Sequence, residues 1–143
     1  MKKLSVLVLV LGLLFSCKET VKKETAESVK LSNRIEVIDF HSTHRCMTCN
    51  AIESNTKSTL NHYFSNELKS DKITFQSVNV DEEENFQLAE KFQATGTSLF
   101  LNVIADGKET IVDLTDFAFM EASDENVFSD KLKTKIEAEL TKI

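Results

Sequence analysis

The feature that most constrains this chain is a pair of cysteines, Cys46 and Cys49, that follows an apolar segment at residues 35–40. The β-branched and aromatic side chains of that segment are typical of a buried strand. Two cysteines three residues apart, where a helix begins after such a strand, can bring their sulfur atoms within bonding distance. The helix dipole also favours a thiolate on the first sulfur. The pattern therefore predicts a dithiol–disulfide couple.

The first sixteen residues have the pattern of a secretion signal. A short cationic start at residues 1–3 precedes an apolar run at residues 4–14, which is too short for a membrane-spanning helix. The Leu-Phe-Ser-Cys sequence at residues 14–17 resembles a bacterial lipobox, which implies cleavage before Cys17 and a lipid on that cysteine. We expect residues 1–16 to be a lipoprotein signal peptide. The alternative is an ordinary signal peptide with an incidental cysteine.

The chain has three cysteines, and an odd number in a secreted protein usually leaves one unpaired or bridged to another chain. Assigning Cys17 to a lipid leaves Cys46 and Cys49 as one pair. The cell envelope of a bacterium permits disulfides. We therefore expect a protein that is lipid-anchored to a membrane of the cell envelope and faces the periplasm.

The expected mature chain is acidic. Removal of residues 1–16 takes away Lys2 and Lys3 and no acid, which leaves 15 basic against 23 acidic residues, a net charge of −8. This charge argues against binding to nucleic acid and against a basic patch for anionic lipid. Residues 17–33 are polar and should form a flexible tether after the lipidated cysteine. Residues 34–143 should form one small domain, expected to be a monomer.

Hydrophobic periodicity predicts seven elements in the order β-α-β-α-β-β-α, with an N-cap at Asp81 before the second helix and a turn at Asp106-Gly107 between the last two strands. A helix after each of the first two strands implies a parallel pair, and the hairpin adds antiparallel neighbours. We expect an α/β fold with a mixed four-stranded sheet flanked by helices. The predicted strands are 34–41, 73–80, 98–104 and 109–114, and the predicted helices are 46–68, 86–92 and 124–140. The apolar residues 117–120 favour core packing, with a partner surface as the alternative.

This order, with one Cys-x-x-Cys at the start of the first helix, resembles the thioredoxin fold. The residues that carry the resemblance are 37–40 with the two cysteines, 78–81 and 88–92, within a match over residues 34–142. The Arg-Cys-x-Thr-Cys motif at residues 45–49 is similar to that of certain bacterial thioredoxin-like proteins. The resemblance implies a thiol–disulfide oxidoreductase that acts on protein thiols and disulfides and uses no cofactor.

The chain departs from the thioredoxin pattern in three places. His44 and Arg45 stand where a tryptophan precedes the first cysteine, and the loop before the cysteines is one residue longer. The chain has no proline, so Thr97 or Ser98 occupies the place of the thioredoxin cis-proline. A cis bond without proline costs about 2.5–4 kcal/mol, so we expect a trans peptide there.

The resemblance and the helix position together assign roles to the two cysteines. Cys46 should be the exposed nucleophile, and Cys49, one turn further and more buried, should resolve the mixed disulfide. The alternative is a structural disulfide of the same spacing.

Four further residues could support this chemistry. Arg45 could stabilise the thiolate or contact an acidic partner, or it could be a solvated surface charge. Asp39 could accept the proton of the second cysteine, or it could be a strand-end carboxylate that is only hydrogen-bonded. Thr97 and Ser98 could contact the backbone of a substrate.

Two other functions remain open from the sequence. His41, His44, Cys46 and Cys49 place two imidazoles and two thiols within nine residues, a set that suits zinc or copper(I) in a metal-binding or metallochaperone module. The third possibility is a binding protein of the same fold whose cysteines do not react.

Overall fold

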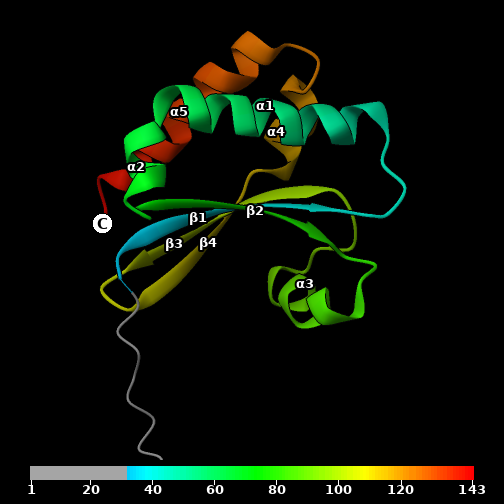
Figure 1. Ribbon diagram of the computed structural model, residues 1–143, viewed down its shortest axis with the longest axis horizontal. Helices are drawn as coiled ribbons and strands as arrows, with labels where there is room; N and C mark the ends of the chain where they lie inside the picture. The colour runs from blue at the N-terminus through cyan, green and yellow to red at the C-terminus, as the bar shows by residue number, and fades with distance from the viewer. Residues whose placement is uncertain (1–31) are drawn as a thin grey trace, which may run out of the picture.

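The computed structural model describes residues 32–143 (Figure 1). Its strands form one sheet in the order β2-β1-β3-β4. β1 runs parallel to β2 and antiparallel to β3, and β3 pairs with β4 in a hairpin. This confirms the mixed four-stranded sheet. The strand bounds are β1 (Arg34–His41), β2 (Ile73–Asn79), β3 (Ser98–Ala105) and β4 (Lys108–Asp113).

The signal peptide and the lipidated Cys17 that the sequence predicts lie outside the described residues, as do residues 17–31 of the expected tether. Within residues 32–143 no helix is long and apolar enough to cross a membrane.

Helices cover both faces of the sheet. One face carries most of them, and the short helix α3 covers the opposite face (Figure 1). The molecule is therefore an α/β sandwich of three layers. The helix that begins at the two cysteines lies in the larger helical layer. The helices of that layer are α1 (Met47–Tyr63), α2 (Ser65–Lys69), α4 (Thr115–Glu121) and α5 (Glu125–Leu140); the 3-10 helix η1 (Glu83–Asn85) leads into α3 (Phe86–Phe92).

The sheet separates two hydrophobic cores. Successive residues of β1 point to opposite faces, so Val37 joins the core beneath α1 and α5 while Ile38 joins the core beneath α3. The larger core contains Ile52, Leu132 and Ile136, among others. Five of the eight residues of β1 are buried, and all of these except Asp39 are apolar, as suits a central strand that is covered on both faces.

The smaller core is aromatic. The rings of Phe40, Phe92 and Phe100 pack against one another with centroids 5.4–5.9 Å apart. This cluster attaches α3 to the sheet and holds the end of β1, from which the cysteine loop departs. The loop therefore starts from a rigid position.

The end of the first predicted helix and the predicted N-cap of the second differ from the structure, and the bounds of β2, β3, β4 and α5 differ from the prediction by one residue at one or both ends. The first helix ends at Tyr63, because the backbone at Phe64 leaves the helical conformation (φ −125°, ψ 28°) and its ring is buried in the larger core. Asp81 is not the N-cap of the second helix. Its carboxylate instead accepts a hydrogen bond from the backbone N–H of Thr43 at 2.7 Å, which ties the cysteine loop to the end of β2.

The hairpin turn is confirmed, with φ of 51° at Asp106 and 77° at Gly107. An additional helix, α4, occupies the apolar residues that follow β4. The prediction of core packing is correct for Phe117 and Ala118 and wrong for Phe119 and Met120, which are exposed.

Candidate thiol–disulfide site

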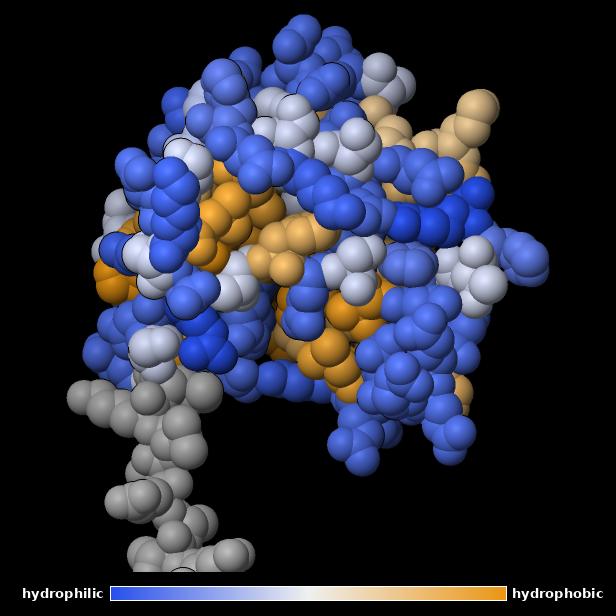
Figure 2. All heavy atoms as spheres, in the orientation of Figure 1, coloured by the Kyte–Doolittle hydropathy of each residue, from blue (hydrophilic) through white to orange (hydrophobic). Residues whose placement is uncertain are grey.

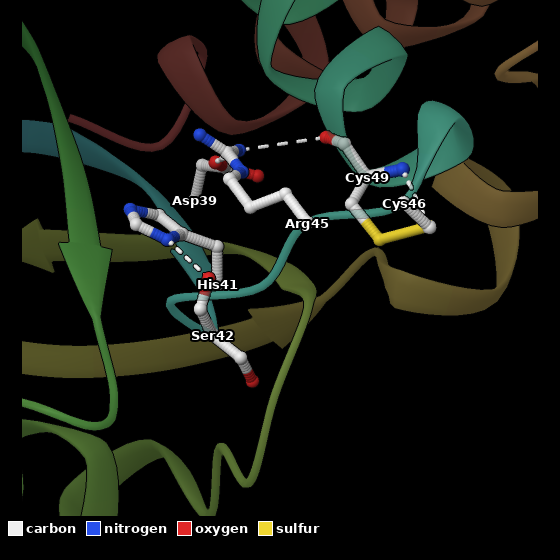
Figure 3. Close-up of a disulfide and its surroundings, with 6 residues drawn as sticks. All are labelled: Asp39, His41, Ser42, Arg45, Cys46 and Cys49. Carbon is white, nitrogen blue, oxygen red and sulfur yellow. Dashed lines mark hydrogen bonds and ion pairs between the residues drawn. A yellow bond between two sulfur atoms is a disulfide. The ribbon is translucent and has the colours of Figure 1, made fainter.

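Cys46 and Cys49 form a disulfide where α1 begins (Figure 3). Their Cα atoms are 5.1 Å apart. Cys46 is exposed, whereas only 8% of Cys49 is accessible. The pairing and the difference in exposure agree with the sequence prediction, and they leave Cys46 as the sulfur that a partner can reach.

The sulfur of Cys46 caps α1. Cys46 has an extended backbone conformation, and its Sγ accepts a hydrogen bond from the backbone N–H of Cys49 at 3.1 Å. The first turn of α1 holds no acidic residue that would oppose a negative charge. In the reduced protein, this N–H and the helix dipole both favour the thiolate of Cys46 over its thiol.

Asp39 is fully buried on β1, on the face that α1 covers. Burial raises the pKa of this carboxyl to about 7, although the positive charge of Arg45 opposes the shift. One oxygen, Oδ2, accepts a hydrogen bond from Arg45 at 3.2 Å. The other, Oδ1, has no hydrogen-bond partner among residues 32–143. A carboxyl with these properties can gain or lose a proton near neutral pH.

The guanidinium of Arg45 points into the protein (Figure 3). It forms ion pairs with Asp39 and Glu53, and its Nη2 lies 3.5 Å from the carbonyl oxygen of Cys49. Only 19% of the side chain is accessible. Arg45 is therefore neither a solvated charge nor a cation held against Cys46 Sγ, because two carboxylates draw it beneath α1.

Glu53 is the site residue that the sequence analysis missed. It forms ion pairs with Arg45 and with Lys57, one turn further along α1. Burial raises the pKa of Glu53, but the hydrogen bonds from Lys57 and Arg45 outweigh burial and lower it. The available signal was spacing, since position 53 lies four residues after Cys49 and so on the same side of the helix.

Thr97 and Ser98 lie where β3 begins, at the edge of the sheet that carries the cysteine loop, because Ser98 pairs with Phe40 of β1. Residues 32–143 contain no cis peptide bond, so the expected trans peptide is confirmed. Ser98 is buried, and its hydroxyl donates to the carbonyl of Gly96 at 3.2 Å. Thr97 is half-buried. It lines a surface pocket of about 290 Å³ that Asp116 also borders.

The four residues of the predicted metal set are not gathered by the fold. The sulfurs of Cys46 and Cys49 are bonded to each other, His44 is exposed, and His41 donates from Nδ1 to the carbonyl of Ser42 at 3.0 Å. In the part of the chain that the structure describes, no three His, Cys, Asp or Glu side chains are placed to hold a metal ion. The geometry favours the disulfide over a ligand set.

No protein-family model matches this chain, and no curated protein matches it. Among solved structures, thioredoxin from Fasciola hepatica is 24% identical, with 62% of this chain and 77% of that chain covered and a TM-score of 0.41. Mitochondrial thioredoxin 3 from Saccharomyces cerevisiae, in its oxidized form, is 22% identical, with 63% and 76% covered and a TM-score of 0.41. A malarial protein is 18% identical, with 62% and 96% covered and a TM-score of 0.40.

The order of the strands and helices and the position of the disulfide bear on the predicted fold. A β-α-β unit with parallel strands β1 and β2 is followed by α3 and an antiparallel hairpin, and the sheet order is β2-β1-β3-β4. A Cys-x-x-Cys disulfide stands at the start of the helix that joins the two parallel strands. This topology, with a disulfide at the start of α1, is consistent with the thioredoxin-like fold that the sequence predicts.

Proposed function

We propose that this protein is a thiol–disulfide oxidoreductase of the bacterial cell envelope that acts through the Cys46–Cys49 couple. The observation that carries the proposal is the exposed Cys46 sulfur, which is bonded to a buried Cys49 and receives an N–H hydrogen bond at the start of α1. An accessible, stabilised thiolate with a resolving neighbour is what thiol–disulfide exchange needs.

The exchange proceeds in two steps. The Cys46 thiolate attacks one sulfur of a partner disulfide, and the partner's other sulfur leaves as a thiolate. Cys49, having lost its proton, then attacks Cys46 Sγ and releases the second partner sulfur. The partner gains two electrons and two protons, and Cys46 and Cys49 become a disulfide. A dithiol donor reduces the couple again, and the same steps in reverse oxidise a partner dithiol.

Asp39 is the proposed proton acceptor for Cys49. Its pKa of about 7 lets it hold or release a proton under the conditions in which exchange occurs. Its unpartnered Oδ1 can receive that proton, directly or through one water. Arg45 bridges Asp39 and the Cys49 carbonyl, and so fixes the position of the carboxyl relative to the resolving cysteine.

The test is disulfide exchange by the full chain with Cys17→Ser, so that two thiols remain. We expect Cys46→Ser to abolish reduction of a model protein disulfide. We expect Cys49→Ser to retain the first attack and to accumulate the mixed disulfide, which mass spectrometry detects. Exchange that persists at the parent rate in Cys46→Ser would overturn the mechanism. The midpoint potential of the couple gives the direction, because about −270 mV is typical of a reductant and about −120 mV of an oxidant.

Attachment of the protein to a membrane through a lipid on Cys17 is the second part of the proposal. Its support is the lipobox-like sequence at residues 14–17. We expect the full-length protein, expressed in bacteria, to sediment with membranes and Cys17→Ser to lose the lipid. Ser16→Ala is the matched control, because a small residue is kept before the cysteine. A Cys17→Ser protein with the same lipid mass would contradict this assignment.

A further inference from the structure

Two carboxylates divide the guanidinium of Arg45 between them. Its Nη1 pairs with Glu53 of α1. Its Nη2 donates to Asp39 of β1 at 3.2 Å and lies 3.5 Å from the carbonyl oxygen of Cys49 (Figure 3). A guanidinium is a planar fork that can bind both oxygens of one carboxylate with two parallel hydrogen bonds. Because Glu53 takes one arm of the fork, Asp39 receives only another.

This division leaves a buried polar atom without a partner on each side of the pair. Among residues 32–143, neither Oδ1 of Asp39 nor Nε of Arg45 has a hydrogen-bond partner. A guanidinium that turned two of its N–H groups to Asp39 would satisfy both atoms at once, and a buried polar atom left alone is costly. Glu53 therefore holds Arg45 in an arrangement that the Arg45–Asp39 pair by itself would not favour.

The charged and polar groups that face Asp39 come from the cysteine loop and two elements. They are Arg45 in the loop, Glu53 and Lys57 on α1, and Ser77 on β2, which pairs with Asp39. The side chains that β3 and α5 add to the core on this face are apolar. Burial raises the pKa of Asp39 to about 7, and of these groups only Glu53 adds to the rise.

Glu53 is itself held in place and keeps its charge. Its side chain is 15% accessible, and Lys57 pairs with it from the next turn. Burial raises the pKa of Glu53, but hydrogen bonds from Lys57 and Arg45 outweigh burial and lower it. Figure 2 shows a band of hydrophilic atoms across the upper part of the molecule, where α1 lies in Figure 1. The series of charges thus ends in solvent at the half-accessible Lys57, and Glu53 stays negative whether or not Asp39 holds a proton.

We propose that Glu53 is a positioning residue for the exchange: by holding Arg45, it keeps one oxygen of Asp39 free to take the proton of Cys49. The inference rests on the proposed function, in which the proton passes from Cys49 Sγ to Asp39 and the new thiolate attacks Cys46 Sγ, which expels the partner's sulfur as a thiolate. Within residues 32–143 the Glu53 carboxylate bonds only to Arg45 and Lys57, so it acts on this step through Arg45. Without Glu53, Arg45 turns to both oxygens of Asp39, and the carboxylate becomes a weaker base.

The test separates the two steps of exchange in the reduced full chain carrying Cys17→Ser. The substrate is an aromatic disulfide whose released thiol absorbs visible light, and release is followed by stopped flow. Attack by Cys46 becomes faster with more disulfide, whereas resolution by Cys49 is intramolecular and does not; Cys49→Ser identifies resolution, because only the first release remains. We call the pH at which resolution is half-maximal the resolution midpoint. In Glu53→Met it should fall by about one pH unit, while the first attack keeps its pH dependence.

Three further variants separate position from charge. Glu53→Gln removes the charge but keeps an acceptor for Arg45, so its resolution midpoint should fall less than that of Glu53→Met. Lys57→Met is the matched control on the same helix, and it should not lower the midpoint, because it removes a positive charge. In an Arg45→Met background, Glu53→Met should shift the midpoint by less than half as much. If Glu53→Met loses its circular-dichroism spectrum, Glu53→Gln takes its place in both backgrounds.

The outcomes separate the two proposals. A resolution midpoint that does not move in Glu53→Met, or a shift of equal size with and without Arg45, overturns the positioning role and leaves the exchange intact. Equal shifts in Glu53→Gln and Glu53→Met assign the effect to charge alone and also overturn it. If the parent releases no thiol, the proposed function fails, and Glu53 is then judged by carbon NMR titration of the Asp39 carboxyl, with Asp39→Asn to assign its signal. Equal titration midpoints in the parent and Glu53→Met overturn the role of Glu53 there.

Discussion

Beside the disulfide, four side chains of alternating charge form a series of ion pairs. Asp39, Arg45, Glu53 and Lys57 follow one another from the sheet to the surface of α1. Because Glu53 shares the guanidinium of Arg45, Asp39 keeps one hydrogen bond and one oxygen without a partner. Burial then exceeds the effect of Arg45, which is why the carboxyl retains its proton up to about pH 7.

The pH dependence of stability tests this account of Asp39. Its pKa is about 7 in the folded protein against an ordinary value of 3.8, so the folded state binds one more proton between those pH values. Stability from this group is therefore present at acidic pH and falls as the pH rises toward 7. We expect Asp39→Asn to be more stable than wild type at neutral pH, by roughly 1–4 kcal/mol, with the difference vanishing near pH 4.

Urea denaturation between pH 4 and pH 8 gives the measurement. Asp81→Asn is the control of opposite sign. The backbone N–H of Thr43 lowers the pKa of Asp81, so the carboxylate contributes stability that is present near neutral pH and lost in acid. Asp81→Asn should therefore weaken the protein at neutral pH. A constant difference between Asp39→Asn and wild type across this range would refute the raised pKa.

At the scale of the element, α1 joins the reactive group to helix stability. Its N-cap is the sulfur of Cys46, whereas α5 has a conventional cap, Asp124, whose carboxylate accepts from the N–H groups of Asn126 and Val127. A cysteine at the cap position is thus both the start of the helix and the group that a partner attacks. Substitutions at this position change structure as well as chemistry.

Serine and alanine at position 46 should separate these two effects. Both remove the disulfide, but a serine hydroxyl can still accept the Cys49 N–H and an alanine cannot. We expect Cys46→Ala to unfold at lower urea concentration than Cys46→Ser, with a difference of about 1 kcal/mol, while neither variant exchanges disulfides. Equal stability of the two reduced variants would show that the cap contributes nothing.

The whole molecule derives its stability from two cores on opposite faces of one sheet. The larger core joins α1 and α5 to β1 and β3, and the smaller joins α3 to the same strands. The disulfide closes a single helical turn and connects no distant segments. The fold therefore depends on hydrophobic packing, and the cysteine pair can open and close without loss of the domain.

Leu132→Ala should test the larger core. Leu132 is fully buried at the centre of α5, and its truncation should lower the free energy of unfolding by about 2–5 kcal/mol. Val127→Ala on the same helix is the control, because Val127 is 36% exposed and should cost well under half as much. Urea denaturation of the oxidised proteins measures both. A loss below about 1 kcal/mol for Leu132→Ala would contradict the assigned core.

Local patterns in the sequence predicted much of this molecule. The first strand was predicted with its observed bounds, because β-branched and aromatic residues favour a strand. Asp106-Gly107 was predicted to be a turn, because both residues tolerate a positive φ. The cysteine spacing predicted the disulfide, because the distance between two sulfurs three residues apart depends only on the geometry of one helical turn. The break at Phe64 and the short helix α4 were missed, because tertiary packing and not local propensity determines both.

The surroundings of the disulfide depend on the fold as a whole. Cys46 and Cys49 could be paired from their spacing, but the partners of Arg45 could not, because Asp39 on β1 and Glu53 on α1 come together only when the helix packs on the sheet. The same packing buries Asp39 and thereby raises its pKa, and it sets Phe119 beside Met47. The pairing of two cysteines three residues apart depends on local helix geometry. Burial and charge pairing instead require segments that only folding brings into contact.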